Sequence, residues 1–251
     1  MPLEKGGLNH RRGGPFMPEH QLESEGFSIV VLGSFNPTIF QPLWFSANNL
    51  IPSEEASGPD TKIQIIHKNA TIFSTEWFSL QVTDSNFTLQ TSDPTKSQPL
   101  RDLAVGTFKV LEHTPLTVFG LNRYGHFQMP SREKWHTFGR HFAPKASWSA
   151  ILKEPDLKSL VIEGKRANCA ATINVTIQPS IIVDPGVFIA VNEQHNLLEP
   201  KDTTSADCNR RFLELLQGSW GDFLQYAANV YKHLFSEYMT PSARASRKKR
   251  G

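Results

Sequence analysis

Hydrophobic and polar residues alternate along several short stretches of the chain, a pattern typical of strands that bury one face. In 171–178 the odd positions are apolar and the even positions are Thr, Asn or Gln. Alternation in 78–82 and 87–89 flanks a polar turn and predicts a β-hairpin. Short β-branched runs predict further strands at 27–33, 62–66, 70–73, 116–127, 157–163 and 187–191. The sequence therefore predicts mostly antiparallel sheet.

Three other segments have the periodicity of helices that bury one stripe. A helix is predicted near 98–113, and Ser131 is placed to cap a short helix near 131–142. The longest helical signal lies near 204–238, where Thr204 and Asp207 form a capping box. Gly218 interrupts this last stripe, so we expect a kinked helix or two helices there.

The order of these elements lacks the regular strand–helix alternation of a doubly wound fold. We therefore expect an α+β fold with mostly antiparallel sheet in a single domain spanning 26–240. A β–α arrangement near 62–112 and again near 157–238 suggests two similar halves. The ends, 1–25 and 241–251, carry no fold signal and are expected to be disordered.

Composition changes this picture little, because 39% hydrophobic and 20% charged residues in 251 are ordinary for a folded domain. No apolar run is long enough for a membrane span, and the N-terminus has no apolar core of a secretory signal. We therefore expect a soluble cytoplasmic protein that does not enter a membrane. Two cysteines without paired spacing indicate neither a disulfide framework nor a zinc ribbon.

Positive charge is concentrated in the last eleven residues, which contain no acidic residue. The basic side chains are Arg244, Arg247, Lys248, Lys249 and Arg250. Such a tail can bind nucleic acid by releasing counterions from the phosphates. A solvated terminus is the favoured interpretation, because no aromatic residues are interleaved with the charges. The body, 26–240, is slightly acidic, with a formal charge of −2.

The string Val30-Val-Leu-Gly-Ser-Phe-Asn-Pro-Thr38 resembles the first strand and loop of the nucleotidylyltransferase superfamily. The resemblance implies a loop whose backbone amides meet nucleotide phosphates at the start of a helix. It covers nine residues and then ends, because Pro42 stands where the family has its catalytic histidine and Ile39 where it has His or Thr. A strand ended by an Asn-Pro turn is the favoured interpretation.

The densest polar and aromatic cluster is Asn122-Arg-Tyr-Gly-His-Phe127. On a strand, Arg123 shares one face with the glycine between Tyr124 and His126, while Asn122, Tyr124 and His126 share the other. With Asn36, these residues are the candidate binding residues, and the alternative is an ordinary solvent-facing strand. Phe40, Trp44 and Phe45 form a second candidate, an apolar patch for a partner, whose alternative is packing in the core.

No complete catalytic constellation is present in the sequence, and we expect no catalytic residue, metal ligand or cofactor. The favoured function is a non-catalytic binding or accessory protein with a protein partner or as a homo-oligomer. Two alternatives stay open. One is an enzyme whose site combines the Asn36 loop with the Asn122–His126 strand, and the other is nucleic-acid binding through the basic tail.

Overall fold

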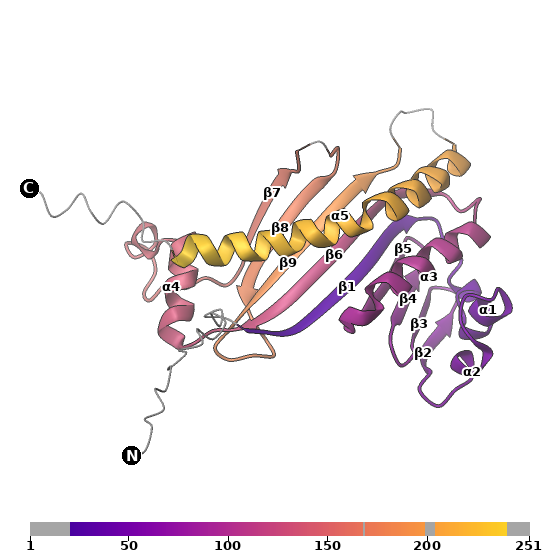
Figure 1. Ribbon diagram of the computed structural model, residues 1–251, viewed down its shortest axis with the longest axis horizontal. Helices are drawn as coiled ribbons and strands as arrows, with labels where there is room; N and C mark the ends of the chain where they lie inside the picture. The colour runs from indigo at the N-terminus through magenta and orange to yellow at the C-terminus, as the bar shows by residue number, and fades with distance from the viewer. Residues whose placement is uncertain (1–20, 168, 199–203, 240–251) are drawn as a thin grey trace, which may run out of the picture.

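A single antiparallel sheet of nine strands, in the order β2-β3-β4-β5-β1-β6-β9-β8-β7, forms the framework (Figure 1). The computed structural model describes residues 21–167, 169–198 and 204–239. Within them the strands are β1 (Gln21–Gly33), β2 (Lys62–His67), β3 (Ala70–Ser74), β4 (Ser79–Thr83), β5 (Asn86–Thr91), β6 (Leu116–Gln128), β7 (Leu160–Lys165), β8 (Thr172–Pro179) and β9 (Gly186–Asn196). The helices are α1 (Pro42–Ala47), α2 (Ser53–Ala56), α3 (Ser97–Val110), α4 (Arg132–Phe142) and α5 (Ser205–Met239). The predicted α+β class is confirmed.

The chain repeats one arrangement twice around the central pair of strands, β1 and β6. After β1 come short helices, the strands β2 to β5 and the long helix α3. After β6 come α4, the strands β7 to β9 and the longer helix α5. In each half the last strand returns to lie beside the first, so β5 pairs with β1 and β9 pairs with β6. The predicted pair of similar halves is confirmed, with one strand fewer in the second half.

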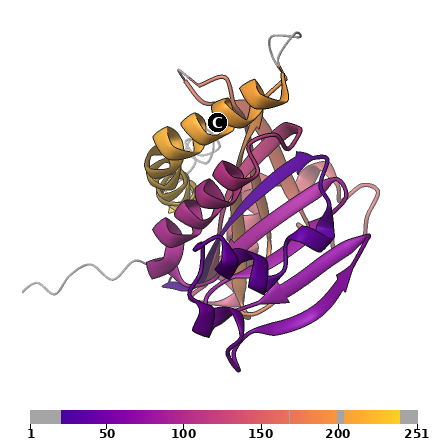
Figure 2. The same cartoon turned by 90° about the vertical axis from the view of Figure 1, so that its right-hand side faces the viewer.

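One face of the sheet packs against α3 and α5 and forms the core (Figure 2). Aromatic rings interlock there, with centroid distances of 5.1 Å for Phe87–Phe108 and 5.0 Å for Phe108–Phe212. Phe212 also meets Phe119 of β6 at 5.0 Å, which joins the two halves through one continuous cluster. Removing a Phe side chain from water contributes about 1.5–3 kcal/mol, so this face dominates the stability of the fold.

The aromatic segment around α1 belongs to this core. Phe40 and Phe45 are 1% and 0% exposed, and Trp44 is half-buried. The ring of Phe45 lies 5.9 Å from that of Phe73 on β3, on the face that carries the helices. The hypothesis that Phe40, Trp44 and Phe45 form a surface patch for a partner is therefore wrong, because Phe40 and Phe45 are buried in the core and Trp44 is half-buried beside them.

Asn36 occupies a local turn between β1 and α1. Its Oδ1 accepts hydrogen bonds from the backbone and the hydroxyl of Thr38, at 3.3 and 2.7 Å, and thereby caps the three-residue 3-10 helix Pro37–Ile39. The six-residue helix α1 begins only at Pro42. The loop therefore does not lead directly into an α-helix, contrary to what the nucleotidylyltransferase resemblance implied.

Two predicted boundaries are wrong at the N-terminal side of strands. β1 begins at Gln21, so the residues 21–25 that we expected to be disordered extend the central strand. β7 runs from Leu160 to Lys165, later than the predicted 157–163. The residues 1–20 and the basic tail lie outside the described residues. Of the helices that are described, none is both long and apolar enough to cross a membrane.

Of the two arrangements expected at Gly218, two separate helices are excluded, because α5 is one continuous helix of 35 residues. Its inward side chains keep helical spacing across the glycine, with Phe212, Leu216, Trp220 and Phe223 all fully buried. A glycine within a helix costs about 1 kcal/mol relative to alanine. The free energy gained by packing this stripe on the sheet exceeds that cost, so the helix continues past Gly218.

Replacing Gly218 by alanine should stabilise the protein. A Cβ at Gly218 would have no neighbour within 4 Å, and its φ is not positive, so Gly218→Ala should raise the free energy of unfolding by about 0.5–1 kcal/mol. Gly26→Ala is the matched control that should destabilise, because its Cβ would clash with the Tyr124 side chain. Urea unfolding midpoints measure both, and an unchanged or lower midpoint for Gly218→Ala would contradict a continuous helix.

Candidate functional site

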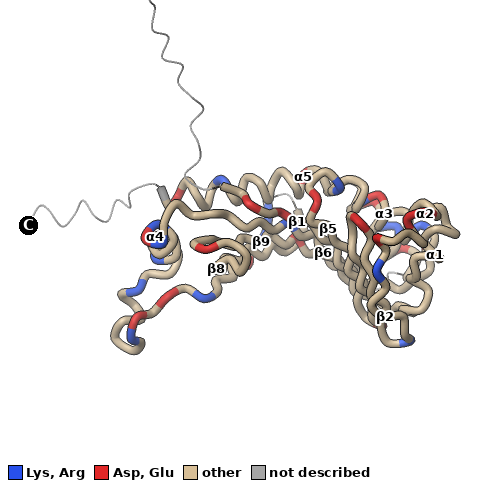
Figure 3. Tube along the Cα trace, turned by 90° about the horizontal axis from the view of Figure 1, so that it is seen from below, with Lys and Arg blue, Asp and Glu red and all other residues tan. Residues whose placement is uncertain are grey.

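The face of the sheet opposite α3 and α5 carries no helix among the described residues. Figure 3 shows the sheet as an arch, with the helices along its outer side and β2 and β8 toward its two ends. Because successive side chains of a strand point to opposite faces, the burial of Phe27, Ile29 and Val31 toward the helices places Ser28 and Val30 on the inner side of this arch. We call this surface the open face.

Strand pairing aligns one residue from each of the nine strands in a row across the open face. The row is Lys62, Ser74, Ser79, Gln90, Ser28, Asn122, Asn192, Asn174 and Glu163. Only the two edge strands contribute charged members, and all the residues between them are amides or hydroxyls. The open face therefore has a central band that both donates and accepts hydrogen bonds without net charge.

The centre of this band is organised by Asn122. Its Oδ1 accepts a hydrogen bond from Asn192 Nδ2 at 2.9 Å, and its Nδ2 donates to the Ser28 carbonyl at 3.5 Å. Gly120 lies beneath the Asn192 amide, and a Cβ there would approach Asn192 Nδ2 to 2.8 Å. The two amides are therefore held in position by neighbouring strands, with Gly120 making the necessary space.

An aromatic cluster lies beside the band on β6 and β9. The Phe188 ring lies 5.9 Å from Tyr124 and 4.8 Å from His126, measured between centroids. The Tyr124 ring lies over Gly26 of the neighbouring strand. His126 Nδ1 is 2.9 Å from the Ser180 hydroxyl. Burial raises the pKa of Tyr124 and lowers the pKa of His126, so both side chains favour the neutral form.

Arg123 lies on the opposite face of β6, beneath α5. Its guanidinium meets Glu25 Oε1 at 2.6 Å and donates to the Leu224 carbonyl of α5 at 2.6 Å. It also lies over the rings of Phe27 and Tyr231, at 5.6 and 5.7 Å. The predicted division of this strand between two faces is thus observed, and Arg123 is a half-buried structural cation that links α5 to the central strands.

The remaining predicted site residues are not brought to the open face. Asn36 lies beyond Gly33, the last residue of β1. Gly33 is five strand residues from Ser28, which pairs with Asn122, and this separation is about 16 Å at 3.3 Å per residue. Asn36 is therefore separated from the Asn122–His126 strand. Arg244, Arg247, Lys248, Lys249 and Arg250 lie outside the described residues.

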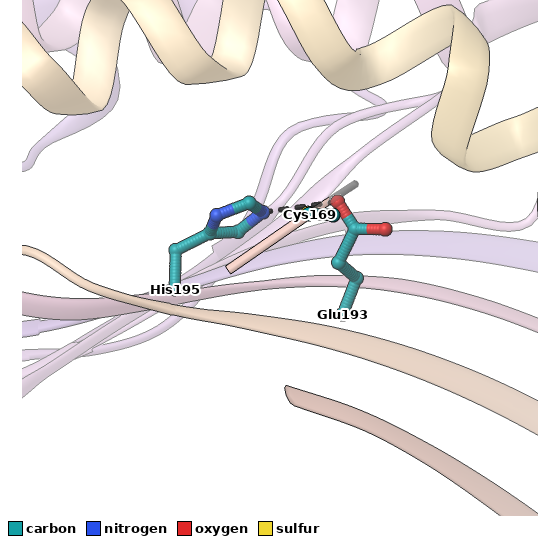
Figure 4. Close-up of side chains that lie close together, drawn as sticks. All are labelled: Cys169, Glu193 and His195. Carbon is teal, nitrogen blue, oxygen red and sulfur yellow. Dashed lines mark hydrogen bonds and ion pairs between the residues drawn. The ribbon is translucent and has the colours of Figure 1, made fainter. Parts of the chain in front are cut away.

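A second polar cluster, which the sequence did not reveal, lies between β9 and α5 (Figure 4). Cys169, Glu193 and His195 each place one potential ligand atom within 4.8 Å of the others. Glu193 is fully buried, and its Oε2 accepts a hydrogen bond from Arg166 at 3.0 Å. The sequence feature that could have indicated this cluster is the pair Glu193 and His195, two residues apart on a strand whose other inward residues are apolar. Cys169, from the segment before β8, had no signal.

The two clusters use adjacent residues of β9, whose side chains point to opposite faces of the sheet. Asn192 belongs to the open face, and Glu193 and His195 belong to the covered face. No family model matches this chain, and no curated protein matches it. The function must therefore be inferred from the chemistry of the two faces. The open face can bind through neutral hydrogen-bonding groups and aromatic rings, and the covered cluster offers sulfur, nitrogen and oxygen ligands.

A structural role for Arg123 predicts a large loss of stability on its removal. Arg123→Met should lower the free energy of unfolding by about 3–5 kcal/mol, because it leaves the Glu25 carboxylate buried without its cation. Asn122→Ala, its neighbour on the open face, should cost only about 0.5–1.5 kcal/mol. Urea denaturation of the two variants measures both values. Equal small losses would contradict the structural role.

The lowered pKa of His126 predicts a dependence of stability on pH. Below its ordinary pKa of 6.5 the unfolded chain binds more protons at this side chain than the folded chain does. His126 therefore contributes stability that is present above 6.5 and is lost as the pH falls through 6.5 toward the lowered value. His126→Gln should flatten the pH dependence of the unfolding free energy in this window. Urea titrations at several pH values test it, and an unchanged slope would contradict the burial effect.

Proposed function

We propose that the protein is a non-catalytic binding protein that receives another protein on its open face. The observation that carries the proposal is the uncharged row of amides and hydroxyls between β3 and β8, with Tyr124, His126 and Phe188 beside it. The row lies on secondary structure that the core holds in place. Binding there requires little ordering of the backbone, which lowers the entropic cost of association.

The composition of this surface supports a protein as the partner. Protein-binding surfaces that recognise varied partners are rich in Tyr, Ser, Gly and Asn, since rigid rings supply contact area and small polar groups adapt their hydrogen bonds. The open face combines Tyr124 with Ser28, Asn122, Asn192 and Gly120. The half-buried Tyr124 and Phe188 are the candidate anchors, because aromatic residues dominate binding energy in such interfaces.

Charge and shape favour a different protein as the partner over a nucleic acid or a second copy of this chain. Nucleic-acid binding requires Lys and Arg beside the phosphates, and the central band has neither. A second copy using the same surface would have to be complementary to itself. Two inner sides of an arch do not fit together (Figure 3). We therefore assign a different protein, one that presents a convex or extended segment to the arch.

Site-specific photocrosslinking in the cells that produce the protein tests this assignment. Benzoylphenylalanine replaces Gln90 or Gln194, which are exposed on the open face, and in a matched control it replaces Gln217, which is exposed on α5. The expected result is a covalent adduct with one distinct polypeptide from both open-face positions and none from Gln217. An adduct sensitive to nuclease, a crosslinked dimer of this chain, or the absence of any adduct would contradict the proposal.

The captured polypeptide then permits a quantitative prediction. Tyr124→Ala should weaken its binding by at least about 2 kcal/mol, roughly 30-fold, because a buried aromatic anchor is removed. Gln217→Ala should leave the affinity unchanged. Isothermal titration calorimetry gives both dissociation constants, and circular dichroism verifies that each variant is folded. Equal affinities for wild type and Tyr124→Ala would place the interface elsewhere.

A further inference from the structure

We infer that Cys169, Glu193 and His195 form a binding site for a divalent metal ion of the zinc type, on the covered side of β9. The three side chains come from two separate segments and converge beneath α5 (Figure 4). His195 Nε2 lies 3.0 Å from Glu193 Oε1, and the Cys169 sulfur lies within 4.8 Å of both potential ligand atoms. The inference does not depend on the function proposed for the open face.

The spacing of the three ligand atoms is close to that of a tetrahedral site. Zinc binds nitrogen and oxygen at about 2.0–2.2 Å and sulfur at about 2.3 Å, so ligand atoms in such a site are about 3.3–3.7 Å apart. The Nε2–Oε1 distance is slightly shorter than this, and the sulfur is at most moderately further away. Movements of about 1 Å bring all three atoms to bonding distance, and a water molecule would complete four ligands.

Two ligands are already oriented by groups around them. Arg166 donates to Glu193 Oε2 at 3.0 Å, which leaves Oε1 directed at His195. The His195 ring is stacked on Phe119 with a centroid distance of 4.6 Å and an interplanar angle of 6°. Hydrogen bonds and packing that orient the ligands in this way are a regular feature of metal sites.

A divalent ion meets two anionic ligands, and the cluster together with Arg166 then carries a net charge of +1. Binding deprotonates the Cys169 thiol and releases its proton to solvent, and the imidazole proton leaves Nε2 for Nδ1. One thiolate and one carboxylate then neutralise the ion. Arg166 keeps its own support after the carboxylate is shared, since its side chain is 20% exposed and its guanidinium lies over the Tyr226 ring at 5.3 Å.

The donor set selects the type of metal. Sulfur, imidazole nitrogen and one carboxylate oxygen together suit zinc and its spectroscopic substitute cobalt, whereas magnesium and calcium require oxygen ligands throughout. Three protein ligands with one open position is the arrangement of zinc sites that keep a bound water. The half-buried Cys169 lies on the solvent side of the cluster, since both other ligands are buried.

Cobalt titration of the metal-free, untagged full chain tests the site directly. With Co²⁺ the expected spectrum shows visible bands of tetrahedral cobalt and a near-ultraviolet thiolate-to-cobalt charge-transfer band, both saturating at one equivalent. Added Zn²⁺ should abolish both. Cys169→Ser should lose the charge-transfer band and bind Zn²⁺ more than tenfold more weakly in competition with a chromogenic chelator. Cys208→Ala, which removes the other cysteine, should retain both the band and the affinity.

Thermal unfolding supplies a readout that does not depend on cobalt. Zn²⁺ should raise the midpoint of wild type and of Cys208→Ala by more than that of Cys169→Ser, because weaker binding gives less stabilisation. Circular dichroism establishes that Cys169→Ser is folded before either measurement. If wild type shows no thiolate band at excess Co²⁺, or if Cys169→Ser retains the band, the cluster is a buried ion pair beside a thiol and the inference is overturned.

Discussion

The antiparallel pairing of β1 with β6 is the constraint on which the rest of the structure depends. It is the longest strand pair of the sheet, and it joins the two halves, which also meet through α3 and α5. Each half adds its strands outward from this pair, and each ends in a helix that returns across the same face. Because side chains alternate along a strand, the register of this one pair decides which residues are buried and which form the open face.

The covered face supplies both the hydrophobic core and a small number of buried polar groups. A polar group in such a place is costly unless it has partners, and the two buried glutamates have them. Glu25 is paired with Arg123, and Glu193 is hydrogen-bonded by Arg166 and His195. The first pair ties the central strands to α5. The second brings Cys169, from the segment before β8, close to Glu193 and His195 of β9.

The two candidate sites therefore share one strand without sharing a surface. On β9, Asn192 belongs to the amide band, while its neighbour Glu193 belongs to the covered cluster with Cys169 and His195. A strand that is paired on both sides holds both sets of side chains with little freedom. The open face suits contact with a large partner because it is broad and neutral. The covered cluster suits a single ion because it is small and enclosed.

Local sequence patterns by themselves determined most of the elements and the assignment of side chains to faces. The alternation in 171–178, the hairpin of β4 and β5, the short helix capped by Ser131 and the opposite orientations of Arg123 and Tyr124 all depend on neighbours within a few residues. Such interactions are encoded in periodicity and capping. The repetition of two β–α halves was also visible, because it follows from the order of elements.

Only the tertiary structure decided the features that depend on distant contacts. Phe40 and Phe45 are buried because they pack against Phe87 of β5 and Phe73 of β3, and α5 continues through Gly218 because its apolar stripe rests on the sheet. Cys169 approaches His195 through the registers of β7, β8 and β9, which no spacing along the chain expresses. Burial and convergence are properties of packing between elements, so they follow from the folded arrangement rather than from local pattern.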